Sequence, residues 1–200
     1  MKIIGVEGLD KSGKHTVSIA IVQYLKNKGF KVQHSEFHRY DTPTGKLIMD
    51  WLTNKWDVSQ HTIELIMAAD KQSQQEWIQS LEDEGYDYLI LDRYTRSQIV
   101  YGIVNGIDKM WLSELQNYIR KPDMELYIDV PAEVSMQRKG KHNNGENDRY
   151  ESDKEMLERV RNLYLFMADK DHKVDKIEGN QEIEHVIEDA IGYVEKLTRK

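Results

Sequence analysis

The sequence predicts an α/β fold in which helices cover both faces of a five-stranded parallel sheet. Short apolar runs typical of buried strands alternate along the chain with longer segments of helical periodicity. A glycine-rich loop joins the first such strand to the first helix. With 200 residues, 39% of them apolar, the chain is long enough to bury one core. We therefore expect a single domain over residues 1–200.

Five apolar runs are the expected strands. They cover residues 2–6, 31–37, 88–91, 126–130 and, more weakly, 173–177. Residues 16–25 carry helical apolar spacing, and the longest expected helix covers about residues 60–84 and ends at Gly85. In a parallel sheet, ligands bind at the carboxyl ends of the strands. Residues 92–94, which follow the third strand, are therefore candidate site residues.

The loop after the first strand predicts a site for nucleotide phosphates. It matches a phosphate-binding P-loop at all but its last position, with the residues Gly8, Leu9, Asp10, Lys11, Ser12, Gly13, Lys14 and His15. In this geometry the backbone N–H groups and the helix N-terminus converge on an anion, and Lys14 reaches the outer phosphates. We expect residues 8–16, including Thr16, to bind a nucleotide polyphosphate.

His15 departs from the P-loop pattern. Most P-loops have Ser or Thr here, and its hydroxyl binds the magnesium ion held between the outer phosphates. An imidazole prefers softer metals. Three interpretations follow: Thr16 substitutes, other groups hold the magnesium, or the chain binds nucleotide without turning it over.

Composition excludes several classes of protein. The absence of cysteine excludes a disulfide scaffold and a thiolate zinc site. A net charge of −7 argues against broad binding of nucleic acid polymers. We find no signal peptide, and no apolar run approaches the roughly 18 residues of a membrane span. We expect a cytoplasmic protein that binds free nucleotides.

Asp92, Arg93 and Tyr94 follow the third expected strand. Taken alone, such residues more often form a helix cap and a surface charge. Beside a P-loop, Asp92 is suited to hold magnesium, directly or through water, and Arg93 to bind a phosphate bidentately. These residues predict a second wall of the phosphate site.

Five motifs in order resemble the thymidylate kinases, which are nucleoside monophosphate kinases, over nearly the whole chain. They are the P-loop, residues 37–46, residues 67–71, residues 92–101 and residues 147–151. The resemblance implies the three-layer P-loop NTPase fold with a short lid. It also implies ATP as donor, Mg²⁺ as cofactor, and transfer of the γ-phosphate of ATP to dTMP, which gives dTDP.

The resemblance assigns catalytic roles to Lys14, Lys11, Arg93 and Arg149. Lys14 would hold the donor's outer phosphates, Lys11 would neutralise developing charge, and Arg93 would bind the acceptor phosphate. The acceptor phosphate has a second pKa of about 6, so it is mostly dianionic at neutral pH and needs no general base. Catalysis is then mainly positioning and electrostatics.

The resemblance also implies a set of acceptor-binding residues. They are Asp10, Phe37, Arg39, Tyr40, Met67, Lys71, Arg93, Ser97, Gln98, Tyr101 and Tyr150. Arg39 is a second candidate for the acceptor phosphate, Tyr101 would crowd the ribose 2′-position, and Tyr150 would pack on the sugar. Asp10 would lie near the 3′-hydroxyl or the magnesium, and Asp10 and Asp92 are the candidate metal ligands.

A polar, glycine-bounded segment at about 139–149 is expected to be the lid. Its closure would exclude water from the reaction. The cations Arg138, Lys139, Lys141 and Arg149 would close over the phosphates; apart from Arg149, they are equally consistent with solvated surface. A simple surface connection is the alternative.

Met67 and Lys71 stand where the family has an aromatic ring that stacks on thymine and an arginine that contacts it. Met adapts its shape, and Lys lacks the planar fork of Arg. Both changes predict a broadened or shifted base preference, although a helical Met also commonly fills core. Gln98, with a donor and an acceptor, is suited to read an imide edge.

Other functions remain open. The alternative is a kinase for a nucleoside or another deoxynucleoside monophosphate, such as a dUMP-like, modified-pyrimidine or dGMP acceptor. A nucleotide-dependent switch or inactive binding module is a further alternative. Some thymidylate kinases carry a basic residue at the position of His15, so we expect an active, magnesium-dependent enzyme. The resemblance implies a homodimer, and four tryptophans offer apolar surface or core: Trp51, Trp56, Trp77 and Trp111.

Overall fold

The structure is a computed structural model, and it describes residues 1–138, 149–150 and 153–198. Five parallel strands form one sheet in the order β2-β3-β1-β4-β5. The strands are β1 (Lys2–Gly8), β2 (Val32–Glu36), β3 (Tyr88–Asp92), β4 (Met124–Asp129) and β5 (Val174–Glu178). Each lies at one of the five expected runs, so the predicted sheet is confirmed.

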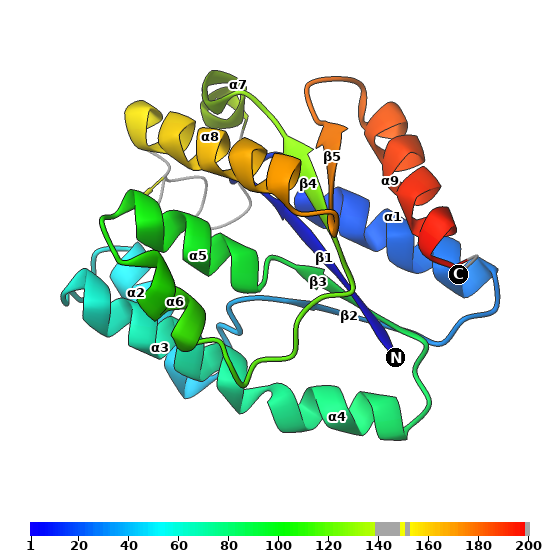
Figure 1. The fold of residues 1–200 in the computed structure, drawn as a ribbon, viewed down its shortest axis with the longest axis horizontal. Helices are drawn as coiled ribbons and strands as arrows, with labels where there is room; N and C mark the ends of the chain where they lie inside the picture. The colour runs from blue at the N-terminus through cyan, green and yellow to red at the C-terminus, as the bar shows by residue number, and fades with distance from the viewer. Residues whose placement is uncertain (139–148, 151–152, 199–200) are drawn as a thin grey trace.

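Helices connect the strands and cover both faces of the sheet (Figure 1). They are α1 (Lys14–Asn27), α2 (Pro43–Leu52), α3 (Gln60–Ser73), α4 (Gln75–Asp83), α5 (Thr95–Val104), α6 (Lys109–Glu114), α7 (Ala132–Gln137), α8 (Lys154–Lys170) and α9 (Ile183–Thr198).

Alternating side chains of the strands build separate cores on the two faces of the sheet. On one face, Ile4, Ile90 and Leu126 pack with α1 and α9. On the other, Tyr127 packs with α5 and α8, and Leu89 packs with α4. The helices α2 and α3 lie one layer further out, where α3 contacts α5. This outer layer forms one side of the candidate site.

The helix expected over residues 60–84 is in fact two helices, which meet at Gln74. The ψ of Gln74 is −1°, and the N–H of Gln74 donates to the carbonyl of Lys71, three residues earlier, at 3.2 Å. The side chain of Gln75 donates to the same Lys71 carbonyl at 2.8 Å, and Arg39 donates to Gln74 Oε1 at 3.3 Å. The hydrogen bond from Arg39 is a tertiary contact, and α3 ends here although the apolar pattern of the sequence continues.

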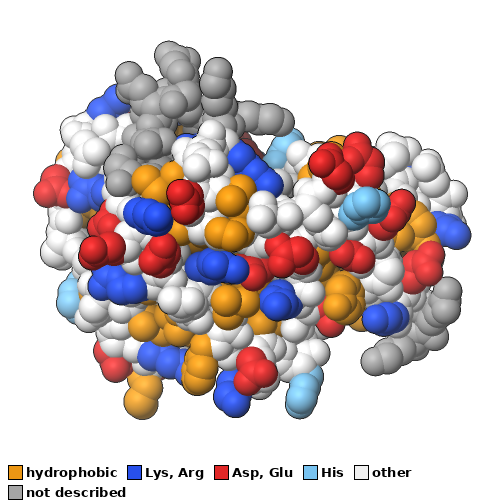
Figure 2. Space-filling model, turned by 90° about the horizontal axis from the view of Figure 1, so that it is seen from above, with side chains coloured by type: hydrophobic (Ala, Val, Ile, Leu, Met, Phe, Trp, Pro, Cys, Tyr) orange, Lys and Arg blue, Asp and Glu red, His pale blue; other side chains and the backbone are white. Residues whose placement is uncertain are grey.

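The sheet register brings the two predicted phosphate-binding segments together. Val6 pairs with Asp92, so β1 and β3 end side by side, and the N–H of Arg93 donates to the carbonyl of Val6 at 2.9 Å. On the face shown in Figure 2, basic side chains are interspersed with acidic ones. Among the described residues, the helices are too short or too polar to cross a membrane.

Candidate active site

The loop between β1 and α1 has the shape that phosphate binding requires. Gly8 has a φ of 152°, and a Cβ there would lie 2.7 Å from the carbonyl oxygen of Ile128. Gly13, with a φ of 100°, is the N-cap of α1. Glycine is needed at both positions, since other residues rarely adopt these conformations. The N-terminus of α1 therefore opens directly at the loop.

Lys14 is buried within this loop, and its ammonium group donates to the carbonyl of Leu9 at 2.6 Å. Burial and the nearby charge of Arg93 lower the pKa of Lys14 to about 8, although Asp10, Asp92 and Glu7 oppose the shift. An anionic phosphate at the loop would favour the charged ammonium. Lys14 is therefore suited to bind a phosphate group, and a bound phosphate would favour its charged form.

Two residues of α7 and its C-cap hold the loop from outside. Ser135 donates from its hydroxyl to the carbonyl of Asp10 at 2.6 Å. Arg138 donates to the carbonyls of Lys11 and Ser12 at 3.3 and 3.4 Å and to that of Gly179 at 3.3 Å. The guanidinium of Arg138 thus supports the loop backbone, a role that the sequence did not reveal.

Arg93 forms the second wall, as expected from the sequence. It is partly buried, and it donates to Asp10 Oδ1 at 2.6 Å and to Ser97 Oγ at 3.1 Å. Although burial opposes its charge, Asp10 raises the pKa of Arg93 well above its usual value. Arg93 remains a guanidinium cation directly beside the P-loop.

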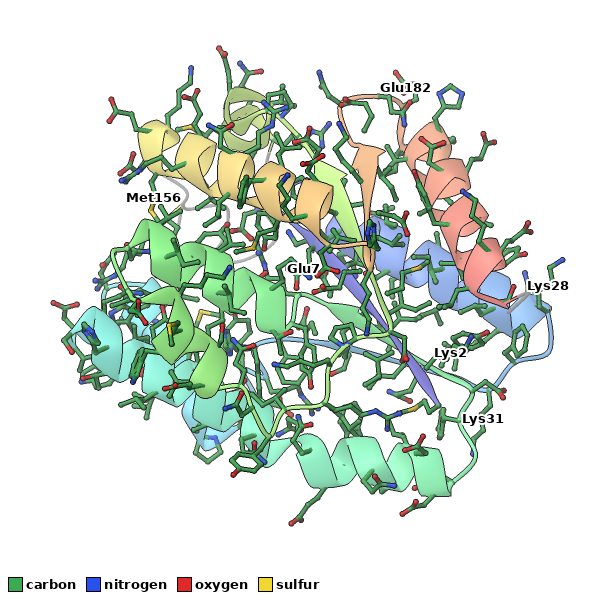
Figure 3. The ribbon with its side chains drawn as sticks, viewed as in Figure 1. Lys2, Glu7, Lys28, Lys31, Met156 and Glu182 are labelled. Atoms are coloured by element: carbon green, nitrogen blue, oxygen red, sulfur yellow. The ribbon has the colours of Figure 1, made fainter. Side chains whose placement is uncertain are left out.

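Glu7 holds the residues next to Arg93 in place through hydrogen bonds. The side chain, labelled in Figure 3, lies fully buried at the centre of the molecule. It accepts hydrogen bonds from the N–H of Tyr94 at 2.9 Å, from the hydroxyl of Tyr164 at 3.0 Å and from the hydroxyl of Ser97. No motif of the sequence includes Glu7, yet a carboxylate within an apolar strand is itself a signal, since a buried charge needs partners.

A cavity of about 80 Å³ adjoins Arg93 and the P-loop. Nine of the eleven residues expected to bind the acceptor line it: Asp10, Phe37, Tyr40, Met67, Arg93, Ser97, Gln98, Tyr101 and Tyr150. His38, Leu52 and Glu64 also line it, and none of these three was expected. The cavity is mixed in character, with aromatic and apolar walls and a few polar groups, as is typical of ligand sites.

Arg39 and Lys71 lie elsewhere than expected. Arg39 borders a separate groove, where its guanidinium pairs with Asp41 at 3.2 Å and lies 5.5 Å from the centre of the Trp77 ring. Lys71 is buried behind the cavity wall and donates to Gln98 Oε1 at 3.1 Å. Burial lowers the pKa of Lys71 to about 8. Lys71 therefore supports Gln98 rather than lining the cavity itself.

Asp70 fixes the segment that carries Phe37 and Tyr40. It accepts hydrogen bonds from the N–H of Arg39 at 3.1 Å and the hydroxyl of Thr44 at 2.8 Å, and its Oδ2 lies 3.1 Å from His38 Nδ1. Burial raises the pKa of Asp70, but these hydrogen bonds outweigh it and lower the value to about 2. The Phe37–His38 peptide bond is cis.

Tyr150 lines the cavity, and its neighbour Arg149 lies against α2. Tyr150 lies between the rings of Trp51 and Tyr101, with centroid distances of 5.5 and 5.1 Å. Arg149 donates to the Trp51 carbonyl at 3.2 Å and pairs with Asp57 at 2.9 Å. In this structure Arg149 thus contacts α2 and the loop after it. The remaining lid residues predicted from the sequence, 139–148 with Lys139 and Lys141, lie outside the described residues.

The two candidate metal ligands, Asp92 and Asp10, differ in their surroundings. Asp92 supplies carboxylate oxygens, with Oδ2 3.8 Å from Nδ1 of the half-exposed His15. Asp10 is paired with Arg93, and no cluster of three His, Cys, Asp or Glu side chains suited to a metal exists among the described residues. Magnesium commonly binds one or two carboxylates together with substrate phosphates and water. Asp92 suits that arrangement, whereas Thr16 is exposed one residue beyond His15.

Comparisons with known proteins agree with this geometry. The family model described as thymidylate kinase matches residues 6–190. A thymidylate kinase of Plasmodium falciparum is 31% identical over 200 residues, covering 98% of this chain and 90% of that protein. A probable thymidylate kinase of Saccharolobus solfataricus is 29% identical over 197 residues, and the match covers 98% of this chain and 97% of that protein.

A solved structure shows the same fold. The thymidylate kinase of Candida albicans, described as having broad substrate specificity, superposes with a TM-score of 0.79 and 27% identity. The match covers 98% of this chain and 92% of that one. The expected three-layer P-loop NTPase fold is confirmed, and this chain belongs to the thymidylate kinase family of nucleoside monophosphate kinases.

Proposed function

We propose that this protein transfers the γ-phosphate of ATP to the 5′-phosphate of dTMP and accepts other bases as well. The observation that carries the proposal is the position of Arg93, which touches the P-loop residue Asp10 and lines the adjoining cavity. A phosphate donor on the loop and a nucleotide in the cavity would bring their phosphates together at this guanidinium.

The reaction needs alignment and charge neutralisation rather than a base. Lys14 and the N-terminus of α1 bind the outer phosphates of ATP, and Lys11 lies in the same loop. Arg93 binds the acceptor phosphate through a forked guanidinium held by Asp10 and Ser97. The dianionic acceptor oxygen attacks the γ-phosphorus, the bond to the bridging oxygen breaks, and ADP leaves. Arg149 is a further catalytic candidate, which would have to leave Asp57 to act.

Magnesium would be held by Asp92, directly or through water, together with the phosphates of ATP. When bound, the ion supplies charge neutralisation between the outer phosphates. Asp10 is the second candidate ligand, and its ion pair with Arg93 competes with that role. His15 provides no hard oxygen ligand, so the site depends more on Asp92 than in a P-loop with Ser or Thr.

The base preference is proposed to be broader than for dTMP alone. Met67 lines the cavity where the family has an aromatic ring, and Lys71 stands behind Gln98 instead of presenting an arginine fork. A flexible thioether surface accommodates different bases. The Candida albicans relative, which is described as having broad substrate specificity, supports the proposal. A preferred acceptor other than dTMP remains the second candidate function.

A coupled assay of ADP formation tests the proposal. Purified protein is assayed with ATP and Mg²⁺, alone and with dTMP, dUMP, dGMP or dCMP. We expect turnover to require an acceptor, with dTMP among the active ones. A rate that is independent of every acceptor would identify a nucleotide switch and overturn the proposal; strict selectivity for dTMP would overturn its broader base preference.

A homodimer in the cytoplasm is also proposed. Trp51 is only 1% exposed and belongs to the core, so it offers no dimer surface. The exposed apolar side chains Leu65 on α3 and Met110 on α6 are better candidates for such a contact. The rings of His61 and Trp111, 5.3 Å apart, join these two helices into one surface.

A further inference from the structure

His15 and Asp92 lie side by side at the edge of the P-loop. His15 follows Lys14 at the start of α1, and Asp92 is the last residue of β3. The two side chains approach each other, with His15 Nδ1 3.8 Å from Asp92 Oδ2. The side chain of His15 is 48% exposed and that of Asp92 12%. His15 also lines the groove of about 590 Å³ that Arg39 borders, so an ion can reach this pair from solvent.

The protein leaves both groups available to a ligand. A separation of 3.8 Å is too long for a hydrogen bond between the imidazole and the carboxylate. The other candidate ligand, Asp10, is engaged more closely, because its Oδ1 accepts from Arg93 at 2.6 Å. Within the described part of the chain, the ring of His15 is the ion-pair partner of Asp92. Asp92 is therefore the freer of the two carboxylates beside the P-loop.

The distance between the two groups suits two ligands of one metal ion. Divalent ions bind oxygen or imidazole nitrogen at about 2.1 Å, so two ligands of the same ion lie up to about 4.2 Å apart. The residue after the P-loop lysine is also the one that normally binds the ion between the outer phosphates. Here that residue is His15, and its nitrogen stands where other P-loops have a hydroxyl oxygen.

The surrounding charges favour a cation at this pair. The ring of His34, on β2, lies 5.9 Å from that of His15 in an edge-to-face arrangement. Burial lowers the pKa of His34; His15 adds to this shift, whereas Asp92 and Glu36 oppose it. His34 is therefore neutral at pH 7 and does not repel an ion. The nearby cation Lys14 belongs to the loop that binds the phosphates.

We propose that His15 Nδ1 and Asp92 together coordinate the metal ion that binds with ATP, and that the site therefore prefers a first-row transition ion such as Mn²⁺ or Co²⁺ to Mg²⁺. Mg²⁺ is a hard cation that binds oxygen ligands, whereas these ions bind imidazole as well as carboxylate and phosphate oxygens. The inference rests on the proposed function and names the ion that its donor site favours.

Pulsed electron paramagnetic resonance of bound Mn²⁺ identifies the ligand without any turnover. The complex is formed with Mn²⁺ and the β,γ-methylene analogue of ATP, whose phosphate chain contains no nitrogen. The wild type is compared with His15→Ser, which restores the usual hydroxyl group. The matched control is His185→Ser, at an exposed histidine on α9. Protein labelled with ¹⁵N-histidine distinguishes an imidazole ligand from the nitrogens of adenine.

We expect coupling of Mn²⁺ to an imidazole nitrogen in the wild type and in His185→Ser, and none in His15→Ser. Displacement of Mn²⁺ by Mg²⁺ from the same complexes measures the ratio of the two affinities. That ratio should favour Mn²⁺ about tenfold less in His15→Ser than in the wild type. A merely structural role of His15 would change both affinities together. Equal ratios, or a wild type without imidazole coupling, would overturn the proposal.

The acceptor assay separates this proposal from the proposed function. Imidazole coupling to Mn²⁺ in a protein that turned over no acceptor would support the role of His15 and overturn the kinase function. Turnover of an acceptor without such coupling would leave the kinase function intact and refute the role of His15. A wild type that failed to bind Mn²⁺ with the analogue would also refute it.

Discussion

At the scale of single residues, two charged groups of the site have pKa values that burial and neighbouring groups shift from their ordinary values. Each shift leads to a prediction. Lys14 has a pKa of about 8, well below the usual lysine value, because it is buried beside Arg93. The unliganded protein therefore loses this proton as the pH rises through 8, whereas bound phosphate favours the protonated form. When ATP binds at alkaline pH, Lys14 must therefore take up a proton.

We predict that the affinity for a non-hydrolysable ATP analogue falls about tenfold between pH 7 and pH 9. Titration calorimetry in two buffers of different ionisation enthalpy measures both the affinity and the proton uptake. Lys14→Arg is the matched control, since a guanidinium stays charged over this range. The same decline in Lys14→Arg would show that another group is responsible.

Asp70 gives a prediction about stability. Its folded pKa of about 2 lies below the ordinary 3.8, so it contributes stability above about pH 4 that is lost as the pH falls toward 2. Asp70→Ala removes the acceptor for Arg39, Thr44 and His38 and should lower the free energy of unfolding by on the order of 3 kcal/mol.

Urea unfolding between pH 7 and pH 3 measures this difference. Asp70→Asn, which retains one acceptor oxygen, should lose less than half as much stability. A loss that is equal at pH 7 and pH 3, or equal in the two variants, would contradict the assigned role of the carboxylate.

At the scale of elements, the site depends on how α2 and α7 pack against neighbouring loops. The helix α2 begins beside the segment that carries Tyr40, and Gly45 makes this approach possible. A Cβ at Gly45 would lie 1.8 Å from the carbonyl oxygen of Arg39, so the backbone must shift to admit it. The wall of the acceptor cavity is coupled to this contact through Tyr40.

We therefore expect Gly45→Ala to raise the KM for the acceptor at least tenfold and to lower the melting temperature, because α2 and the segment at 39–42 separate. Gly192→Ala is the control: it lies in α9 with no atom within 4 Å of its added Cβ. That change should raise stability slightly, by up to about 1 kcal/mol. Steady-state kinetics and thermal unfolding compare the two.

The contact between Arg138 and the P-loop predicts a selective effect on the donor. Arg138→Met removes the hydrogen bonds to Lys11, Ser12 and Gly179 and should raise the KM for ATP about tenfold, with little change for the acceptor. Arg159→Met, an exposed arginine on α8, is the matched control. If both KM values rose equally, Arg138 would be stabilising the fold rather than the loop.

Patterns of single elements predicted the sheet well and the helices less well. The strands β1, β3 and β4 are buried on both faces, and each leaves a continuous apolar run as its local signature, whereas the edge strands β2 and β5 are only partly buried. The division at Gln74 left no such signature, because the apolar spacing continues through it and Arg39, which contacts Gln74, is distant in the sequence. The same limit applies to Arg39 and Lys71: a motif places a residue on an element, but partners elsewhere decide where its side chain points.

At the scale of the whole molecule, the order of strands accounts for what the sequence revealed about the site. The P-loop and Arg93 could both be assigned to the site from the sequence. They follow β1 and β3, which are neighbours in the sheet. Glu64 could not be assigned in this way, because its helical position resembles any solvated charge and its burial arises from α5 packing over it.

The assembly of two chains is the prediction at this scale. Leu65 is 51% exposed and Met110 72% exposed, and their helices are joined through His61 and Trp111. Sedimentation equilibrium should give the mass of a dimer for the wild type and of a monomer for Leu65→Glu, because a charge would be buried at the contact. Tyr118→Glu, at an 89% exposed residue after α6, should remain dimeric. A monomeric wild type would refute the homodimer.

The outer-layer position of α3 has a consequence for how this enzyme can change. The groups that align the phosphates follow the ends of β1 and β3, whereas Glu64 and Met67 belong to α3, a helix that contacts α2, α4 and α5. Replacements on that helix can therefore alter which base is admitted without displacing the transfer machinery. We expect new substrate preferences to arise through single substitutions on α3 that leave the reaction intact.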